Sequence, residues 1–241
     1  MARSLLPRTY LDRSSSLLYS YIIVLPLFLL YEGLIYIAQP GDYKVRISVD
    51  AWMKSLLAWT GFDVITATFA LVFVIGIVVL VMERKRLTDL NWGTFLWMHM
   101  ESIVYAIAMA ASVSYLVSRL FSMQIAPADP QTLTIIDQFA LSLGAGLYEE
   151  LFFRVILVGL LFMLFKRSFR QVWVAAAVAA VIGALIFSAV HYVGNMGDTF
   201  TWSSFAFRAL AGLVLNALYV WRGFGIAVCT HAWYDLFVIL L

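Results

Sequence analysis

"GLYEELFFR" (residues 146–154) places two adjacent carboxylates and an arginine inside an apolar run that extends from about 133 to 165. This run is longer than the roughly 20 residues that a helix needs to cross about 30 Å of hydrocarbon. It does not alternate between polar and apolar residues, as a strand of an outer-membrane barrel would. The stretch therefore predicts a transmembrane helix that carries charged side chains.

The whole chain has the composition of an integral membrane protein. Of its 241 residues, 63% are hydrophobic and 12% are charged. In soluble domains, about half of the residues are apolar and about a quarter are charged. The mean hydropathy is +0.93. We expect an all-α, polytopic transmembrane bundle of about seven spans, in a bacterial-type inner (plasma) membrane. The predicted segments cover residues 16–38, 62–83, 95–120, 133–165, 171–194, 202–221 and 224–241, and a short amphipathic piece covers 49–62.

The loops differ in charge. Lys and Arg occur near the N-terminus, at 84–86 and at 166–170, whereas the loops 122–132 and 195–201 have none. Because cytoplasmic loops of membrane proteins carry the excess of Lys and Arg, this distribution predicts a cytoplasmic N-terminus. The formal net charge is only +2, and nothing in the sequence suggests a nucleic-acid partner.

We expect one integral membrane domain, residues 1–241. Its polar motifs fall in a catalytic core, residues 133–241, and residues 1–132 add N-terminal spans. The fifth segment repeats small residues every four positions, at Ala176, Ala180 and Ala184. A stripe of small side chains lets another helix approach closely.

Charged side chains are costly in hydrocarbon, so they usually face the interior of the bundle and often mark function. Glu150 and Arg154 are four residues apart and share one helical face, where an ion pair offsets much of the burial cost. Glu149 is rotated by about 100° from Glu150 in an α-helix. The spacing therefore predicts a structural pair and one uncommitted carboxylate, Glu149.

Two later spans carry the other intramembrane polar groups. "FSAVH" places Phe187 and His191 on one helical face, and "HAWYD" does the same for His231 and Asp235. Alone, each histidine could be an interfacial or hydrogen-bonded structural residue. The coincidence of Glu149 with both histidines in late spans favours a functional site.

Other polar residues are expected to be structural. We place His99 and Glu101 near the membrane interface, expect Arg208 and Asn216 to hold helices together, and interpret Cys229 as a buried packing residue.

The motifs "EELFFR" (149–154), "FSAVH" (187–191) and "HAWYD" (231–235) occur in the order seen in one family. The chain resembles the CPBP family of CAAX proteases and bacteriocin-processing enzymes, whose motifs are EExxxR, FxxxH and Hxxx(N/D). The resemblance covers about 149–235. It implies a membrane-embedded protease of the glutamic type, with some members described as metal-dependent.

The resemblance also implies roles for individual residues. Glu149 would be the general base on a water molecule, aided by His191, while Glu150, Arg154 and Phe187 would support the helices. His231 and Asp235 would form the side that stabilises the oxyanion. Many members have Asn where this chain has Asp235. Because an ionised Asp cannot donate a hydrogen bond, it must be protonated or act by orienting and charging His231.

A cofactor is not required by this scheme, and we expect none. The alternative is a divalent metal such as zinc, held by Glu149, His191 and His231.

The expected function is an intramembrane endopeptidase acting on a peptide or a membrane-anchored protein, with the lipid bilayer as its environment. The alternative is a non-catalytic scaffold or a transport or immunity accessory protein of the same fold. An ion translocator also uses intramembrane Glu and His, but it needs a polar path across both leaflets, and the first two spans supply almost none.

Overall fold

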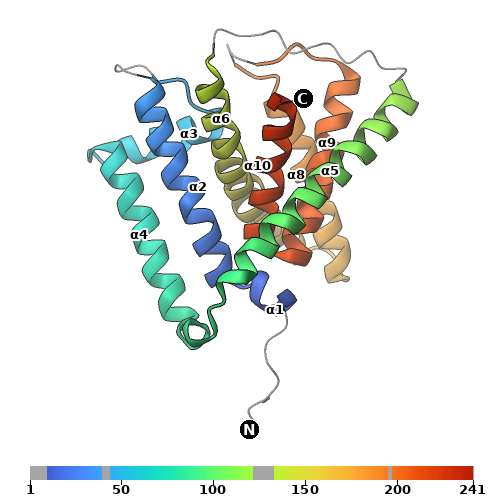
Figure 1. The fold of residues 1–241 in the computed structure, drawn as a ribbon. Coiled ribbons are helices and arrows are strands. Elements are labelled where there is room, and N and C mark those ends of the chain that lie inside the picture. Colours follow the sequence, from blue (N-terminus) through green and yellow to red (C-terminus); the bar gives the residue numbers. More distant parts are fainter. Residues whose placement is uncertain (1–9, 40–43, 122–132, 195–196, 241) are drawn as a thin grey trace.

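The computed structural model describes residues 10–39, 44–121, 133–194 and 197–240, and all regular structure among them is helical (Figure 1). The elements are α1 (Tyr10–Ser14), α2 (Leu17–Ala38), α3 (Ser48–Ala58), α4 (Val64–Met82), η1 (Arg84–Asp89), α5 (Trp92–Phe121), α6 (Ile135–Gly144), η2 (Ala145–Glu149), η3 (Leu151–Val158), α7 (Gly159–Phe165), α8 (Val172–Val190), α9 (Trp202–Arg222) and α10 (Phe224–Leu240). Here η1 is a 3-10 helix, and η2 and η3 are π-helical.

The all-α membrane bundle predicted from the sequence is confirmed. Each of the seven predicted apolar segments is helical, and the amphipathic piece is the short helix α3. Within the described ranges, five helices are long and apolar enough to cross a membrane, namely α2, α4, α5, α8 and α9, and α10 is a shorter apolar helix. The predicted loop 122–132 and the arginines before residue 10 lie outside the described residues.

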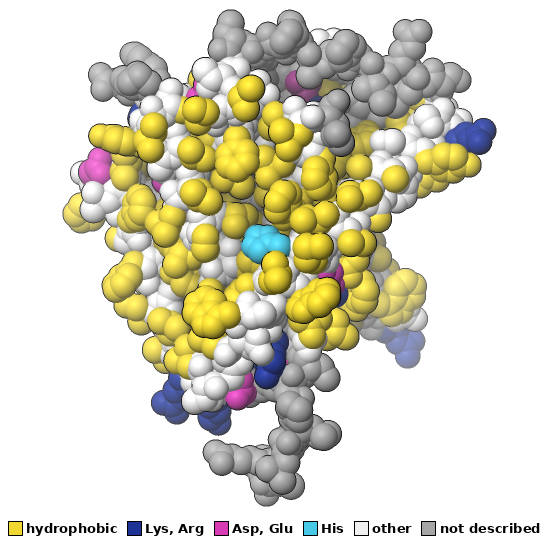
Figure 2. Space-filling view, viewed as in Figure 1, with side chains coloured by type: hydrophobic (Ala, Val, Ile, Leu, Met, Phe, Trp, Pro, Cys, Tyr) yellow, Lys and Arg dark blue, Asp and Glu magenta, His cyan; other side chains and the backbone are white. Residues whose placement is uncertain are grey.

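Helix α10 is central, and it contacts α2, α5, α6, α9 and η2 (Figure 1). Helix α4 lies at the edge, where it contacts α2 and α3. Only 17% of an apolar 18-residue stretch of α4 is buried inside the protein, compared with 39% of the corresponding stretch of α2. Most of α4 therefore faces lipid. Figure 2, viewed from the same side as Figure 1, shows hydrophobic side chains over the middle of the molecule and Lys and Arg side chains near its lower end.

Helices α8 and α9 approach closely along the predicted stripe of small residues. A Cβ added to Gly212 of α9 would lie 3.3 Å from the Cβ of Ala184 in α8. The Nδ2 of Asn216 donates a hydrogen bond to the carbonyl of Ala180 at 2.8 Å. Small side chains and one interhelical hydrogen bond therefore join these helices, as expected in a membrane.

The backbone of η2 lies directly against α10 at Gly146. A Cβ added there would lie 2.8 Å from the amide nitrogen of Ala232 and 2.9 Å from the carbonyl oxygen of Val228. These are backbone atoms of α10, which cannot rotate away as a side chain can. Gly146 therefore sets the distance between the helix of Glu149 and the helix of His231.

We predict that Gly146→Ala lowers the free energy of unfolding by about 1–3 kcal/mol, the usual cost of overpacking a close contact. Gly159→Ala is the matched control, because a Cβ there meets nothing within 4 Å and alanine favours a helix by about 0.5–1 kcal/mol. Thermal unfolding of both variants in detergent measures the difference. Equal midpoints would contradict the close approach of η2 and α10.

Candidate functional site

Glu150 and Arg154 form the buried pair that their spacing predicts. The Nε of Arg154 lies 3.0 Å from Oε2 of Glu150, and the two side chains are 1% and 0% exposed. These two atoms are not aligned as a hydrogen bond, and the guanidinium nitrogens have no hydrogen-bond partner within the described residues. The guanidinium carbon instead lies 4.6 Å from the ring centre of Phe187. The ion pair with Glu150 and the cation–π contact with Phe187 thus stabilise the buried charge of Arg154.

The motif helix differs from the ordinary α-helix that the sequence suggested. Residues Ala145–Glu149 and Leu151–Val158 are π-helical, a form with i→i+5 hydrogen bonds that is frequent at functional sites. A π-helix turns less per residue than the 100° of an α-helix. Both carboxylates of the doublet therefore reach one imidazole, which the α-helical rotation did not predict.

His231 lies between the two carboxylates. Its Nδ1 is 2.7 Å from Oε1 of Glu150, and its Nε2 is 3.9 Å from Oε2 of Glu149. Because an ionised carboxylate can only accept, Nδ1 of His231 carries the proton in the shorter contact. Glu150 thus forms an ion pair with Arg154 and a hydrogen bond with His231. The sequence predicted only the ion pair.

Glu149 lies between the two predicted histidines. Its Oε2 is 3.9 Å from Nε2 of His191 and 3.9 Å from Nε2 of His231. These distances exceed a direct hydrogen bond but suit a small polar group bridging them. The Glu149 side chain remains 13% exposed and that of His191 remains 25% exposed. The structure therefore brings these three residues together and leaves Glu149 and His191 partly accessible, whereas His231 is buried.

Phe187 orients His191 and packs against His231 and Arg154. Its carbonyl oxygen lies 2.7 Å from Nδ1 of His191, so this nitrogen donates and the Nε2 of the neutral ring is an acceptor. The Phe187 ring centre lies 4.9 Å from that of His191 and 6.1 Å from that of His231. Phe187 thus contacts both histidines and Arg154.

Asp235 lies at the edge of this group. Its Oδ2 is 3.6 Å from Nε2 of His231, and its side chain is 26% exposed. This separation is too long for a hydrogen bond. The group that hydrogen-bonds His231 is therefore Glu150 rather than Asp235, and Asp235 contributes negative charge beside the ring.

The residues of the metal alternative are not grouped as a metal site in the described ranges. A tetrahedral zinc site needs ligand atoms about 2.0–2.2 Å from the ion. No group of three His, Cys, Asp or Glu side chains in the described ranges comes close enough together to hold one.

A buried network of charged side chains lies beside the site, and the sequence-based prediction did not include it. The Nζ of Lys54 lies 2.5 Å from Glu32 and 2.6 Å from Asp50, and Arg46 pairs with the same two carboxylates at 3.1 and 2.8 Å. The hydroxyl of Tyr148, the neighbour of Glu149, donates to Glu32 at 3.0 Å. These contacts tie α2 and α3 to η2.

Two signals in the sequence could have identified this network. Glu32 is a carboxylate within a predicted apolar span, and Asp50 and Lys54 are four residues apart on the amphipathic piece. In the loop before α3, burial opposes the charge of Arg46, but hydrogen bonds from its guanidinium to Asp50 and Glu32 raise its pKa.

The remaining polar residues make structural contacts. Glu101 pairs with Arg222 at 2.6 Å, and the indole nitrogen of Trp233 donates to His99 at 3.4 Å. Arg208 donates to the hydroxyl of Tyr192 at 2.9 Å. The predicted structural role of this set agrees with these contacts.

We predict that Arg154→Gln lowers the free energy of unfolding by about 3–5 kcal/mol, because it leaves the buried Glu150 carboxylate without its cation. Arg167→Gln is the matched control. Arg167 is exposed beyond the end of α7, so its replacement should change stability by less than about 0.5 kcal/mol. Unfolding midpoints measured in the same detergent compare them, and a similar small effect for both would show that the pair is dispensable.

Comparison with known proteins supports the interpretation of the three motifs. No curated protein and no solved structure matches the chain. The family model described as "Type II CAAX prenyl endopeptidase Rce1-like" matches residues 131–237. The match includes all three motif segments and the helices that bring Glu149, His191 and His231 together. Residues 131–237 of this integral membrane protein thus match a family model of CAAX-type proteases, the family that its three motifs resemble.

Proposed function

We propose that the protein is an intramembrane endopeptidase in which Glu149 activates a water molecule for attack on a peptide bond. The observation that carries the proposal is the position of Glu149, 3.9 Å from Nε2 of each histidine and without the arginine partner that Glu150 has. The match of residues 131–237 to a protease family model supports the reaction class.

Water fits between Glu149 and His191 in this scheme. The Nε2 of His191 is an acceptor, because Nδ1 donates to the Phe187 carbonyl. A water molecule between them would donate one hydrogen bond to Glu149 and the other to His191, which leaves an oxygen lone pair free for the substrate carbonyl. A base held in this way contributes about 10²–10⁴ in rate.

His231 is the proposed oxyanion partner. With Nδ1 bonded to Glu150, a second proton on Nε2 gives an imidazolium that can donate to the developing oxyanion. Asp235, 3.6 Å from this nitrogen, favours the charged ring by its own negative charge. This role needs no hydrogen-bond donor on residue 235, so an Asp suffices where many family members have Asn.

The proposed reaction conserves atoms and charge. Glu149 takes a proton from water while the hydroxide oxygen bonds to the carbonyl carbon. The tetrahedral intermediate then expels the amine as the C–N bond breaks, and the amine receives the proton from Glu149. The products are a carboxylic acid and an amine, and a proton passes from the acid to the amine to give a carboxylate and an ammonium group.

The proposed substrate is a peptide or a membrane-anchored protein whose scissile bond reaches the bilayer. Glu149 lies midway along the segment from α6 to α7, and His191 follows the last residue of α8. With the N-terminus in the cytoplasm, as its arginines predict, α8 would end on the outer side. That orientation disfavours a cytoplasmic CAAX tail and favours substrates processed nearer the outer surface.

We predict that Glu149→Gln abolishes processing, with a loss of at least about 10²-fold, while protein abundance and unfolding temperature stay unchanged. Membranes and secreted peptides of cells that make the wild-type protein or the variant would be compared by mass spectrometry. Glu83→Gln is the matched control, because Glu83 follows the last residue of α4 and pairs with Arg86.

The same comparison distinguishes a protease from a scaffold. A wild-type peptide pattern and phenotype in cells with Glu149→Gln would exclude Glu149 as a base and would support the non-catalytic alternative. Loss of the pattern in Glu149→Gln and not in Glu83→Gln supports hydrolysis.

We further predict that hydrolysis by the purified protein persists after exhaustive treatment with a metal chelator, because the proposed base, water and oxyanion partner are protein groups. The measurement is the rate of product formation before and after chelation. An activity lost on chelation and restored by zinc alone would support the metal alternative.

A further inference from the structure

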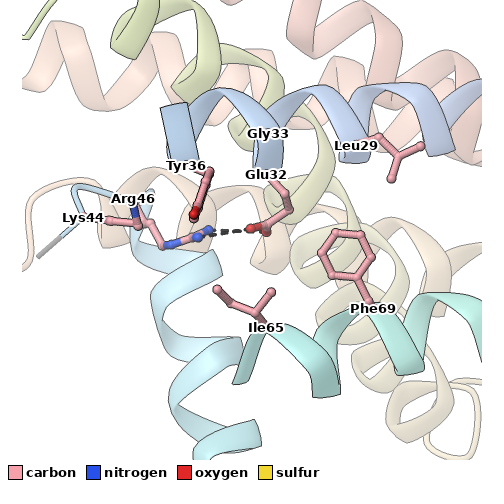
Figure 3. A pocket seen from close by; sticks show the side chains of 8 residues that line it. All are labelled: Leu29, Glu32, Gly33, Tyr36, Lys44, Arg46, Ile65 and Phe69. Carbon is pink, nitrogen blue, oxygen red and sulfur yellow. Dashed lines mark hydrogen bonds and ion pairs between the residues drawn. The ribbon is translucent and has the colours of Figure 1, made fainter. Parts of the chain in front are cut away.

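A cavity of about 360 Å³ lies between α2 and α4, and none of the predicted catalytic side chains lines it. Its two ends differ in chemistry. Figure 3 shows Lys44 and Arg46 at one end, and Leu29 and Phe69 toward the other. The cavity is therefore amphipathic along its length.

The charged end lies where a membrane places its head groups. Tyr36 is in the last turn of α2, and Ile65 is the second residue of α4, and both line the cavity. Leu29 is seven positions earlier in α2, which is about 10 Å deeper at 1.5 Å per residue. A ligand that fills the cavity thus needs a polar group at the membrane surface and an apolar part below it.

Among the described side chains at the polar end, Lys44 has no ionic partner. Arg46 and Lys54 pair with Glu32 and Asp50. Lys44 has only neutral partners in the described part of the chain. It donates to the carbonyl of Gln39 at 2.6 Å, and its ammonium lies 5.2 Å from the Tyr36 ring centre.

One further carboxylate approaches this end, and it is already engaged. Asp137 accepts a hydrogen bond from the side chain of Gln39 at 2.9 Å. It also accepts from the backbone and side chain of Thr134, in the capping box that begins α6. The positive end of that helix balances the charge of Asp137.

Donors for an anion remain at this end. Lys44 uses one of its three N–H groups in the bond to Gln39. Arg46 bonds its carboxylates through Nη1 and Nη2, and its Nε–H has no hydrogen bond among those described. Lysine and arginine N–H groups are the usual ligands of phosphate oxygens.

We propose that this cavity binds a membrane phospholipid, with its phosphate at Lys44 and Arg46 and an acyl chain along Leu29 and Phe69. The phosphate pairs with the Lys44 ammonium, and the acyl chain covers the apolar side chains of Leu29 and Phe69. Glu32 lines the cavity and also accepts the hydrogen bond from Tyr148. The bound lipid therefore lies against the network that reaches the neighbour of Glu149.

Gly33 offers a way to fill the cavity without disturbing the fold. It lines the cavity, and a Cβ added there meets nothing within 4 Å. Leucine at this position would occupy the space of the lipid. Gly159 has the same freedom at the start of α7 and is outside the cavity, so Gly159→Leu is its matched control.

The test is native mass spectrometry of the full-length protein in detergent, after removal of bound lipid and addition of phosphatidylglycerol or phosphatidylethanolamine. Diacylglycerol with the same acyl chains tests the need for phosphate, and inorganic phosphate added as a competitor tests the need for the chains. Lys44→Gln should reduce retained phospholipid by about fivefold or more, the effect of losing one charge-assisted hydrogen bond. Lys85→Gln, at an exposed position in η1, should not.

The expected result is retention of both phospholipids by the wild type and by Gly159→Leu, and loss from Gly33→Leu and Lys44→Gln. Equal retention by Gly33→Leu and Gly159→Leu would overturn the proposal. So would equal retention of diacylglycerol, or displacement of the lipid by inorganic phosphate. Gel filtration confirms that each variant is folded, and the readout does not depend on protease activity.

Discussion

The buried contact of Glu150 with both Arg154 and His231 is the interaction on which the rest of the site depends. Arg154 neutralises the carboxylate at 3.0 Å, and the same carboxylate fixes the ring of His231 at 2.7 Å. A charge buried this deeply is costly unless it is paired. The pairing fixes the motif helix against α10, so that the adjacent Glu149 faces the remaining nitrogen of His231.

The close approach of the backbones makes this contact possible. Gly146 lets η2 lie against α10, and the wider π-helical turns of η2 and η3 direct Glu149 and Glu150 toward the same imidazole. In a membrane, small residues and buried polar contacts supply much of the specificity between helices. Here they also separate two neighbouring carboxylates into a structural residue and a proposed base.

The sequence predicted the helices well because the signals that define them are local. Runs such as 171–194 are apolar over the length of a membrane span, and the observed α8 (Val172–Val190) lies inside that prediction. The pair of Glu150 and Arg154 was also readable, since four residues bring two side chains onto one helical face. The three motifs further indicated the family that residues 131–237 match.

The remaining features depend on contacts between distant parts of the chain. Glu150 and His231 are 81 positions apart, and Tyr148 meets Glu32 across 116 positions. The spacing within one helix does not determine which far-away side chain completes its hydrogen bonds. The π-helical turns were also invisible, because an apolar sequence is compatible with either helical form.

The central claim is that Glu149 acts on water rather than on the substrate directly, and a single-turnover reaction in ¹⁸O-labelled water tests it most directly. With substrate identified, the proposed mechanism predicts one ¹⁸O atom in the new carboxylate of the peptide and none in the side chain of Glu149. Label in the Glu149 carboxylate after turnover would reveal an acyl intermediate on that residue and would contradict its role as a general base.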